Sequence, residues 1–350
     1  MQRNQPALTR TGEAPHFKRD YFMHRRHILQ LGLLGTTLSM TTVSARAQAA
    51  FPSRPLRLVV PFPPGGPTDI FARQYAIRLA GVLGQAVIVD NKSGASGAIG
   101  SMAVKNADPD GLVLLFGTAS THGLYNLITS QPQYDSLQDF THIAIVGGAP
   151  AAFGVGPDGP QTLKGVVEMA RANPGRVQYG SPGEGTYLHL VGERFKRDAG
   201  KLDIQHIPFR GSAQAIPALI GGQVGMTVDT LGSLLPNHKA GKLRIVAVAS
   251  PNRSPLAADV PTVNEALGMR GFEASLWNVL SGPALLPANV IATLAAANLK
   301  VMNDPSLHQQ LAALSIEPVT DSNPAKARSY ISAEMEKWRP VVSATGLKLQ

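Results

Sequence analysis

Two glycine-rich loops carry residue types suited to holding an anion. The first is Pro61–Asp69 (PFPPGGPTD), between a β-branched apolar run and a helical pattern, and the second is Tyr179–Thr186 (YGSPGEGT), in the same kind of position. Where a parallel strand ends and a helix begins, unpaired main-chain N–H groups and the helix dipole both favour negative charge. Neither loop ends in the Gly-Lys-Ser/Thr of a nucleotide-binding P-loop, so the pattern favours a small carboxylate.

Two further predicted strand ends offer hydroxyl groups and a cation. Gly117–His122 (GTASTH) supplies hydroxyl side chains, and Phe209–Ser212 (FRGS) supplies Arg210 and a serine that can cap a helix. We expect both loops to face the same site as the two glycine-rich loops.

Four side chains near these loops each have two interpretations. Asp69 falls in the first helical turn, where it either caps the helix or contacts an amine or hydroxyl of a ligand. His189 lies one turn beyond the second loop, and it is either packed and hydrogen-bonded or a ligand contact. Arg210 is either a ligand contact or a surface charge, and Asp229 either lines the site or caps the segment that follows.

The motifs of several other kinds of site are absent from the sequence. There is no HExxH, no GxSxG and no close His/Asp/Glu cluster with metal spacing. Because there is no cysteine, disulfides, thiol nucleophiles and thiolate metal sites are excluded. Gly94–Gly100 (GASGAIG) has GxxGxxG spacing and follows the second predicted strand, so we interpret it as a turn into a helix rather than a dinucleotide loop. We expect no catalytic residue, no metal and no cofactor.

The basic charge of the chain is concentrated at its start. The formal net charge is +9, but residues 1–49 hold seven of the 32 Lys/Arg and only two of the 23 Asp/Glu. The rest of the chain has 25 bases and 21 acids, and aromatic residues make up only 6% of the whole. This balance predicts no binding of nucleic acid.

Residues 1–49 are predicted to be an export signal that is removed. Met23–His27 (MHRRH) is basic, Ile28–Val43 is apolar, and Ala45–Ala49 (ARAQA) offers small residues for cleavage. The Arg25-Arg26 pair suits either a twin-arginine or an ordinary secretory route. Residues 1–22 are either a long basic segment or an extension ahead of a start at Met23. The apolar stretch is too short and too polar for a stable membrane anchor, so we expect a soluble, exported protein.

Strands and helices alternate through the rest of the chain. In the first half the predicted strands are Leu56–Phe62, Val87–Asp90 and Leu112–Gly117, and the predicted helices are Thr68–Leu83 and Ala98–Ala107. This βαβαβ order predicts a parallel sheet with helices on both faces.

The same alternation recurs in the second half. The predicted strands there are Val177–Tyr179, Ile204–Pro208, Val224–Val228 and Leu243–Ala249, and the predicted helices are Thr186–Ala199 and Ser212–Ile220. Two such units predict two lobes with a cleft between them, the first formed by residues 51–150 and 276–350 and the second by residues 151–275. We expect Thr141–Val155 and Phe272–Ser281 to cross between the lobes, and the mostly helical segment Pro287–Trp338 to return to the first lobe.

The order of these motifs resembles the substrate-binding receptors of tripartite tricarboxylate transporters, also called Bug receptors. The matching segments, in chain order, are FPSRPLRLVVPFPPGGPTDIFAR, VDNKSGASGAIG, PDGLVLLFGT, YGSPGEGT with His189, PFRGS, ALIGGQV, AGKLR, DVPTV and EMEKW. The resemblance spans residues 51–346. It implies an α/β protein of the type II periplasmic-binding-protein fold, with two doubly wound lobes, a ligand cleft and two crossover segments.

The resemblance also implies a function. It points to a periplasmic receptor, not an enzyme, that closes around a small organic acid and passes it to membrane transporter subunits; we expect a monomer without cofactor. The residues that it marks as ligand-binding are Phe62, Pro63, Gly65, Gly66, Thr68, Asp69, Thr118, Ala119, Ser120, Ser181, Gly183, Gly185, Thr186, His189, Phe209, Arg210, Gly211 and Asp229.

Three positions depart from the family pattern. Tyr187 and Leu188 stand where small hydroxyl residues are frequent, and Glu184 stands where Asn is common. A smaller, aromatic or less acidic ligand than a tricarboxylate is therefore one alternative. Two other functions stay open at this point, namely an enzyme that acts on a small carboxylic acid through Asp69, His189 or Asp229, and a sensory receptor that presents its ligand to a membrane kinase.

Overall fold

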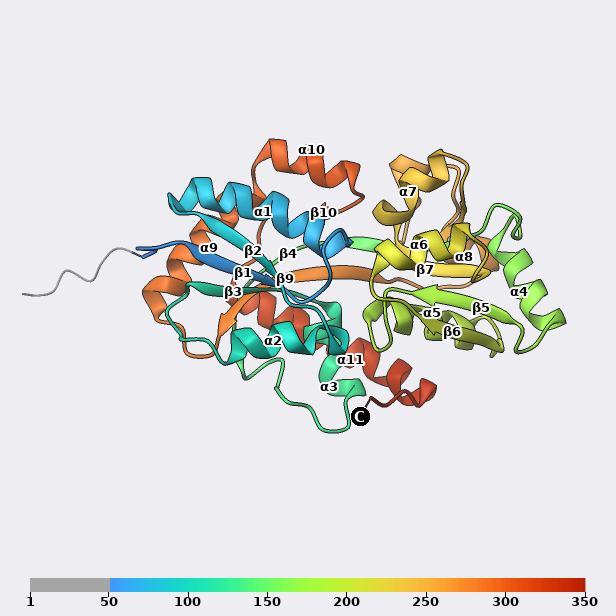
Figure 1. Ribbon diagram of the computed structural model, residues 1–350, viewed down its shortest axis with the longest axis horizontal. Coiled ribbons are helices and arrows are strands. Elements are labelled where there is room, and N and C mark those ends of the chain that lie inside the picture. Colours follow the sequence, from blue (N-terminus) through green and yellow to red (C-terminus); the bar gives the residue numbers. More distant parts are fainter. Residues whose placement is uncertain (1–50, 350) are drawn as a thin grey trace, which may run out of the picture. The chain divides into compact units, whose positions relative to one another are not determined.

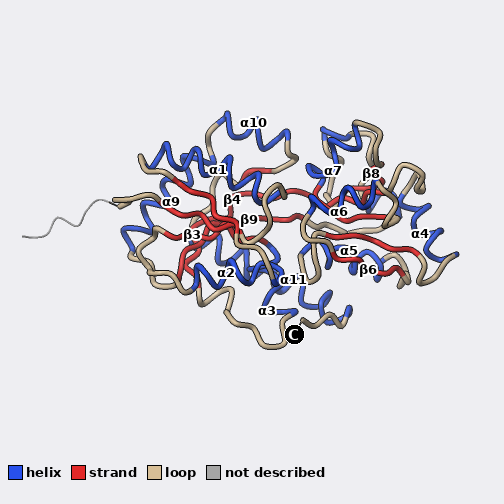
Figure 2. Tube along the Cα trace, viewed as in Figure 1, coloured by secondary structure: helices blue, strands red, loops and turns tan. Residues whose placement is uncertain are grey.

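A computed structural model describes residues 51–349, so the predicted export signal lies outside the described residues (Figures 1 and 2). Within that range, strands follow the order β2-β1-β3-β9-β4-β7-β5-β6, and β8 and β10 also pair with β4. The described residues 51–349 belong to one compact unit. The division into lobes near residues 150 and 275 stays a prediction.

The first region of the sheet carries the first glycine-rich loop. Strand β1 (Leu56–Val60) lies between β2 (Val87–Asn91) and β3 (Val113–Thr118) and is parallel to both. Strand β9 (Ser275–Pro283) is antiparallel to β3. Strand β1 ends before Pro61, because proline has no N–H to donate to a neighbouring strand.

One long strand belongs to both regions of the sheet. The first part of β4 (Phe140–Val155) pairs with β9 up to Pro150, and its last five residues pair with β7 (Met226–Thr230) and β8 (Arg244–Val248). The short β10 (Glu317–Pro318) also pairs with β4. The segments predicted to cross are therefore built mainly of β4 and β9.

The second region carries the other ligand loops. Strand β5 (Val177–Ser181) is parallel to β7 and to β6 (Ile204–Pro208). Because β1, β5 and β6 each run into a loop followed by a helix, the helix N-termini gather at the carboxyl ends of parallel strands. That is where ligands bind in sheets of this type.

Helices cover both faces of the first region (Figure 1). On one face lie α1 (Pro67–Leu83), α9 (Ala288–Met302) and α10 (Pro305–Ala313); on the other lie α2 (Ala98–Lys105), α3 (Tyr125–Ile128) and α11 (Pro324–Thr345). Each face has a buried apolar core of its own, one around Phe71 and Phe116 and the other around Leu115 and Tyr125.

Helices also cover both faces of the second region. On one face lie α6 (Ser212–Ile220) and α7 (Leu231–Lys239); the other core contains residues of α4 (Leu163–Ala172), α5 (Tyr187–Asp198) and α8 (Val263–Leu267). This second core continues into α11, where the rings of Tyr187 and Trp338 are 4.8 Å apart. The C-terminal helix α11 thus packs against elements of both regions of the sheet.

Most predicted elements are confirmed to within about two residues, but α3, α4, α7 and α8 were not predicted. Helix α4 has buried Leu163, Val166, Val167 and Ala170 at helical spacing, a signal that was available in the sequence. Helix α7 begins directly after β7, with Thr230 as its N-cap residue and no loop between them, and it contains Pro236, which is unfavourable inside a helix. None of the helices in residues 51–349 combines the length and the apolar character needed to span a membrane.

Candidate functional site

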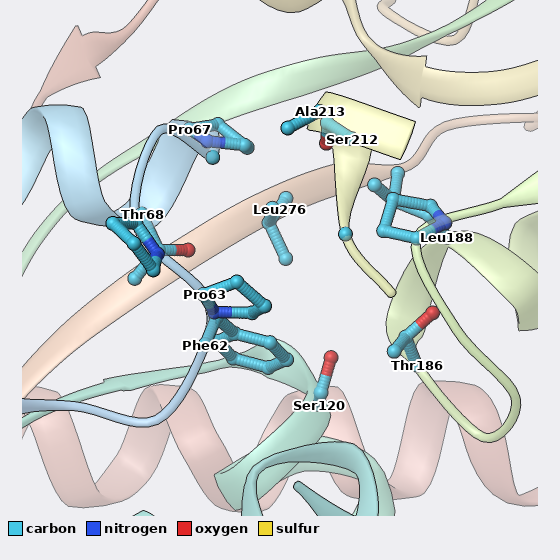
Figure 3. Close-up of a pocket in the computed structure, with 14 residues that line it drawn as sticks. Phe62, Pro63, Pro67, Thr68, Ser120, Thr186, Leu188, Ser212, Ala213 and Leu276 are labelled. Atoms are coloured by element: carbon cyan, nitrogen blue, oxygen red, sulfur yellow. The ribbon is translucent and has the colours of Figure 1, made fainter. Parts of the chain in front are cut away.

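A pocket of about 500 Å³ lies between the loops of the two sheet regions (Figure 3). The side chains around it come from the loops before α1, α5 and α6, from the turn after β3 and from β9. They are Phe62, Pro63, Pro64, Gly66, Pro67, Thr68, Ser120, Pro182, Thr186, Leu188, Gly211, Ser212, Ala213 and Leu276.

The pocket is apolar except for hydroxyl groups and main chain. Its polar side chains are Thr68, Ser120, Thr186 and Ser212, and no charged side chain lines it among the described residues. Helices α1, α5 and α6 all begin at its wall, and the first N–H groups of a helix have no acceptor within that helix. Three helix dipoles therefore supply a positive potential without a cation, which suits a small anion.

The first loop is held by the carboxylate of Asp69. Its Oδ2 accepts hydrogen bonds from Gly65 N at 2.9 Å and Arg73 Nε at 3.0 Å, and its Oδ1 accepts one from Asn91 Nδ2 at 2.9 Å. The side chain is buried and does not line the pocket. Of the two roles predicted for Asp69, the structure therefore supports the structural one, although it fixes the loop rather than capping the helix from the N-cap position.

The surroundings keep Asp69 ionised. Burial works to raise the pKa of Asp69, but the hydrogen bonds from Arg73, Gly65 and Asn91 outweigh it and bring the pKa below its usual value. The negative charge of Asp69 thus lies behind the first loop, outside the pocket lining.

The second loop is held by neutral groups. Thr186 caps α5, since its hydroxyl accepts a hydrogen bond from His189 N at 3.4 Å and donates one to Gly183 O at 2.7 Å. The ring of His189 accepts a hydrogen bond at Nδ1 from Gly185 N at 3.0 Å. Ser181 Oγ lies 2.7 Å from His206 Nε2. His189 therefore supports the loop and does not line the pocket.

His189 and His206 are stacked, with ring centroids 3.7 Å apart and planes 10° apart. Burial lowers the pKa of His189 to about 4, and burial together with the neighbouring His189 lowers the pKa of His206 to about 3. Both imidazoles are neutral at neutral pH, which leaves Nδ1 of His189 free to accept the Gly185 N–H.

The loops of the two sheet regions contact each other directly. Ser120 Oγ accepts a hydrogen bond from Tyr187 N at 2.9 Å, and Ser96 Oγ donates one to Glu184 O. Ser120 is positioned by Thr118, whose hydroxyl accepts from Ser120 N at the start of the π-helical turn Ala119–Leu124. The pocket is thus bridged on one side by main-chain and hydroxyl hydrogen bonds.

The pocket adjoins a larger, open hollow of about 1720 Å³. Phe62, Pro63, Pro182, Thr186 and Gly211 line both spaces. The hollow is also lined by Gly183, Phe209 and the exposed Arg210, together with the Ser93–Ala98 segment and Leu349. Arg210 therefore lies near the pocket rather than in it.

The predicted site residues fall into three groups. Seven line the pocket: Phe62, Pro63, Gly66, Thr68, Ser120, Thr186 and Gly211. Three line only the hollow: Gly183, Phe209 and Arg210. The other eight line neither: Gly65, Asp69, Thr118, Ala119, Ser181, Gly185, His189 and Asp229.

Seven lining residues were not among the predicted ones, namely Pro64, Pro67, Pro182, Leu188, Ser212, Ala213 and Leu276. Six of them belong to the predicted loops or to the first residues of the helices that follow, so the pocket lies at the predicted loops, while the binding role of those loops stays a prediction. Leu276 comes from β9, and nothing in its sequence context separates it from the buried residues around it.

Comparison with known proteins gives consistent results. A family model described as the tripartite tricarboxylate transporter family receptor (TctC) matches residues 71–347. The structure of the periplasmic binding protein BugD is similar, with 30% identity, a TM-score of 0.81 and coverage of 86% of this chain and 100% of that chain.

Two ligand-bound structures are similar as well. Rpa4515 of R. palustris with adipate has 31% identity, a TM-score of 0.81 and coverage of 85% of this chain and 99% of that chain. MatC from Rhodopseudomonas palustris with bound malate has 29% identity, a TM-score of 0.79 and coverage of 83% of this chain and 100% of that chain.

Proposed function

This chain belongs to the receptor family of tripartite tricarboxylate transporters, and on that premise we propose that it captures a small organic carboxylate in the pocket between α1, α5 and α6. The family and the periplasmic-binding-protein type of fold predicted from the sequence are confirmed. Members of this family are periplasmic solute-binding receptors rather than enzymes.

The observation that carries the proposal is the convergence of three helix N-termini on one apolar pocket. A carboxylate there can accept hydrogen bonds from main-chain N–H groups and from the hydroxyls of Thr68 and Ser120. Charge-assisted hydrogen bonds contribute roughly 1.5–3 kcal/mol each, so a few of them, less the cost of ordering the loops, reach the ~8 kcal/mol of a micromolar receptor.

The relatives support the ligand class. Because similar proteins of this family hold adipate and malate, a mono- or dicarboxylate of about four to six carbons is the first class to test. We further propose that the ligand is delivered to membrane transporter subunits, that the protein acts as a monomer and that residues 1–49 direct its export to the periplasm.

The proposal is tested by calorimetric titration of the purified protein with a panel of mono- and dicarboxylates. We expect one acid to bind with 1:1 stoichiometry and to be recovered unchanged, as judged by NMR of the released compound. Depletion of the acid would favour the enzyme alternative, and no binding by any acid would overturn the proposal.

A matched pair of variants ties binding to this pocket. Ala213 lines the pocket at the second position of α6, whereas the adjacent Gln214 is exposed and does not line it. A glutamate is tolerated at either position, because a negative charge in the first turn stabilises a helix. We expect Ala213→Glu to abolish carboxylate binding and Gln214→Glu to leave it intact; equal binding by both variants would place the site elsewhere.

A further inference from the structure

At the α6 end of the pocket and directly behind it, two buried side-chain oxygens have no hydrogen-bond partner among the described residues. Ser212 lines the pocket and is only 4% exposed, and its Oγ has no hydrogen-bond partner among the described residues. Asp229 is fully buried; its Oδ1 accepts a hydrogen bond from Thr230 N at 2.7 Å, but no described group pairs with its Oδ2. Buried polar groups are nearly always paired, so the unpaired hydroxyl of Ser212 at the pocket wall, with the Asp229 carboxylate behind it, indicates a ligand group that completes the hydroxyl.

The fold places the two groups together. Ser212 is the first residue of α6, and Asp229 lies near the end of β7, the strand against which α6 packs. Figure 3 shows Ser212 at the start of α6, at the wall of the pocket. Burial raises the pKa of Asp229 to about 6, and Ser212, Thr230 and Ser233 act in the opposite direction. The Ser212 hydroxyl is therefore close to the carboxyl group of Asp229.

This end of the pocket differs chemically from the other two. At α1 and α5 the groups on offer are main-chain N–H donors and hydroxyls, which suit a carboxylate. At α6 a buried carboxylate offsets the helix dipole, and when the Ser212 hydroxyl turns to donate to Asp229, its oxygen presents lone pairs to the pocket. A second carboxylate of the ligand would be repelled by the buried negative charge of Asp229, whereas a hydrogen-bond donor of the ligand can donate to the Ser212 oxygen.

We propose that Ser212, with Asp229 behind it, forms a subsite that accepts a hydrogen-bond donor of the ligand, a hydroxyl or an ammonium group, and disfavours a second carboxylate. The inference rests on the proposed function, since the carboxylate head of the same ligand is held at the α1 and α5 ends. The ligand class is thus an acid with one anionic end, an apolar body and a donor at the other end.

The test compares end groups at fixed chain length. The probes are butyrate, 4-hydroxybutyrate, 4-aminobutyrate and succinate, and the six-carbon set hexanoate, 6-hydroxyhexanoate, 6-aminohexanoate and adipate. Titration at pH 7.5, where Asp229 is ionised, gives a dissociation constant for each. The comparison uses whichever set, four-carbon or six-carbon, contains the tighter-binding probes. Within that set we expect the hydroxy acid or the amino acid to bind at least about 10-fold more tightly than the diacid.

Variants assign the preference to the two residues. We expect Asp229→Asn to reduce the preference for a donor over a carboxylate by about fivefold or more, and Ser212→Ala to reduce the preference for the hydroxy acid over the unsubstituted acid. Asp203→Asn, which removes an exposed carboxylate outside the pocket, should leave both ratios unchanged. Thermal unfolding of each variant checks that it is folded.

The outcomes separate the two proposals. If no probe binds to the wild-type protein, the proposed function itself fails. If acids bind but the diacid equals or exceeds the donor-bearing acid, or if Asp229→Asn folds and leaves the ratio unchanged, the donor subsite is wrong while the receptor function stands. If the amino acid binds more tightly than the hydroxy acid of the same length, the preferred hydrogen-bond donor is a cationic ammonium group.

Discussion

The two glycine-rich loops present the same kind of surface to the pocket but are fixed from behind in opposite ways. The first loop is held by an ionised carboxylate, that of Asp69, which accepts from Gly65, Arg73 and Asn91. The second loop is held by imidazoles that must stay neutral, because the ring of His189 accepts the N–H of Gly185. A strand-to-helix loop can thus be shaped by an anion or by an uncharged acceptor.

The difference predicts different responses to acid. The pKa of Asp69 is below its ordinary value of 3.8, so its contribution to folding is complete above that value and is lost only at lower pH. The pKa of His189 is lowered from 6.5 to about 4, so its contribution is complete above 6.5 and is lost as the pH falls through 4. The second loop should therefore weaken first as the pH falls.

The largest effect is expected for Asp69→Ala. Removing the carboxylate leaves Gly65 N without its acceptor and one N–H of Asn91 Nδ2 unpaired, since Nδ2 keeps only its hydrogen bond to Phe62 O; this costs roughly 3 kcal/mol of the free energy of unfolding, and the half-exposed Arg73 adds little. Urea unfolding at pH 7.5 measures this loss. Asp69→Asn keeps an acceptor oxygen and should lose clearly less, and equal losses in the two variants would contradict the assigned role.

The next effect concerns the pH dependence of the second loop. Between pH 7 and pH 5, protonation of His189 in the unfolded chain should cost the wild-type protein roughly 2 kcal/mol of unfolding free energy, in addition to the loss from other buried histidines such as His206. The unfolding free energy of His189→Gln should therefore fall by about that much less. Urea unfolding at pH 7, 6 and 5 gives the two curves. The curve of unfolding free energy against pH for Asp69→Asn should run parallel to that of the wild type over this range. A parallel curve for His189→Gln would refute the prediction.

A smaller effect distinguishes the glycines of the two loops. Gly65 and Gly185 both have positive φ, of 80° and 68°, but a Cβ at Gly65 meets nothing within 4 Å, whereas one at Gly185 overlaps the side chain of Leu349. We expect Gly65→Ala to cost about 1 kcal/mol from backbone strain alone and Gly185→Ala about 2 kcal/mol. Adding Leu349→Ala to Gly185→Ala should remove the extra loss that comes from the overlap with the Leu349 side chain. If this double-mutant cycle shows no coupling between the two positions, the Leu349 side chain moves aside without cost.

The smallest effect tests the contact between the loops of the two sheet regions. Ser120→Ala removes the acceptor of Tyr187 N and should lower the free energy of unfolding by about 1 kcal/mol, while Ser120→Thr keeps the hydroxyl and should change it less. Thermal and urea unfolding of both variants give the comparison. If Ser120→Ala leaves the free energy of unfolding unchanged, another acceptor replaces the hydroxyl.

Much of the fold and the place of the site could be predicted from local sequence. Pro63–Gly66 and Pro182–Gly185 interrupt the apolar periodicity at the end of a strand pattern and just before a helical one, so both loops and the helices after them were found. The choice of lining residues was less complete. Leu188 and Leu276 line the pocket, whereas Asp69 and His189, the chemically conspicuous residues, turn away from it.

The sequence by itself determined the alternation of strands and helices and the glycine-rich loops at the strand ends, because these depend on periodicity, on proline and on glycine over short distances. Only the tertiary structure decided which side chains face the pocket. The carboxylate of Asp69 accepts a hydrogen bond from Asn91 on β2, and the hydroxyl of Ser120 accepts one from Tyr187 N at the start of α5. Such pairings depend on how separate elements pack, which local spacing does not encode.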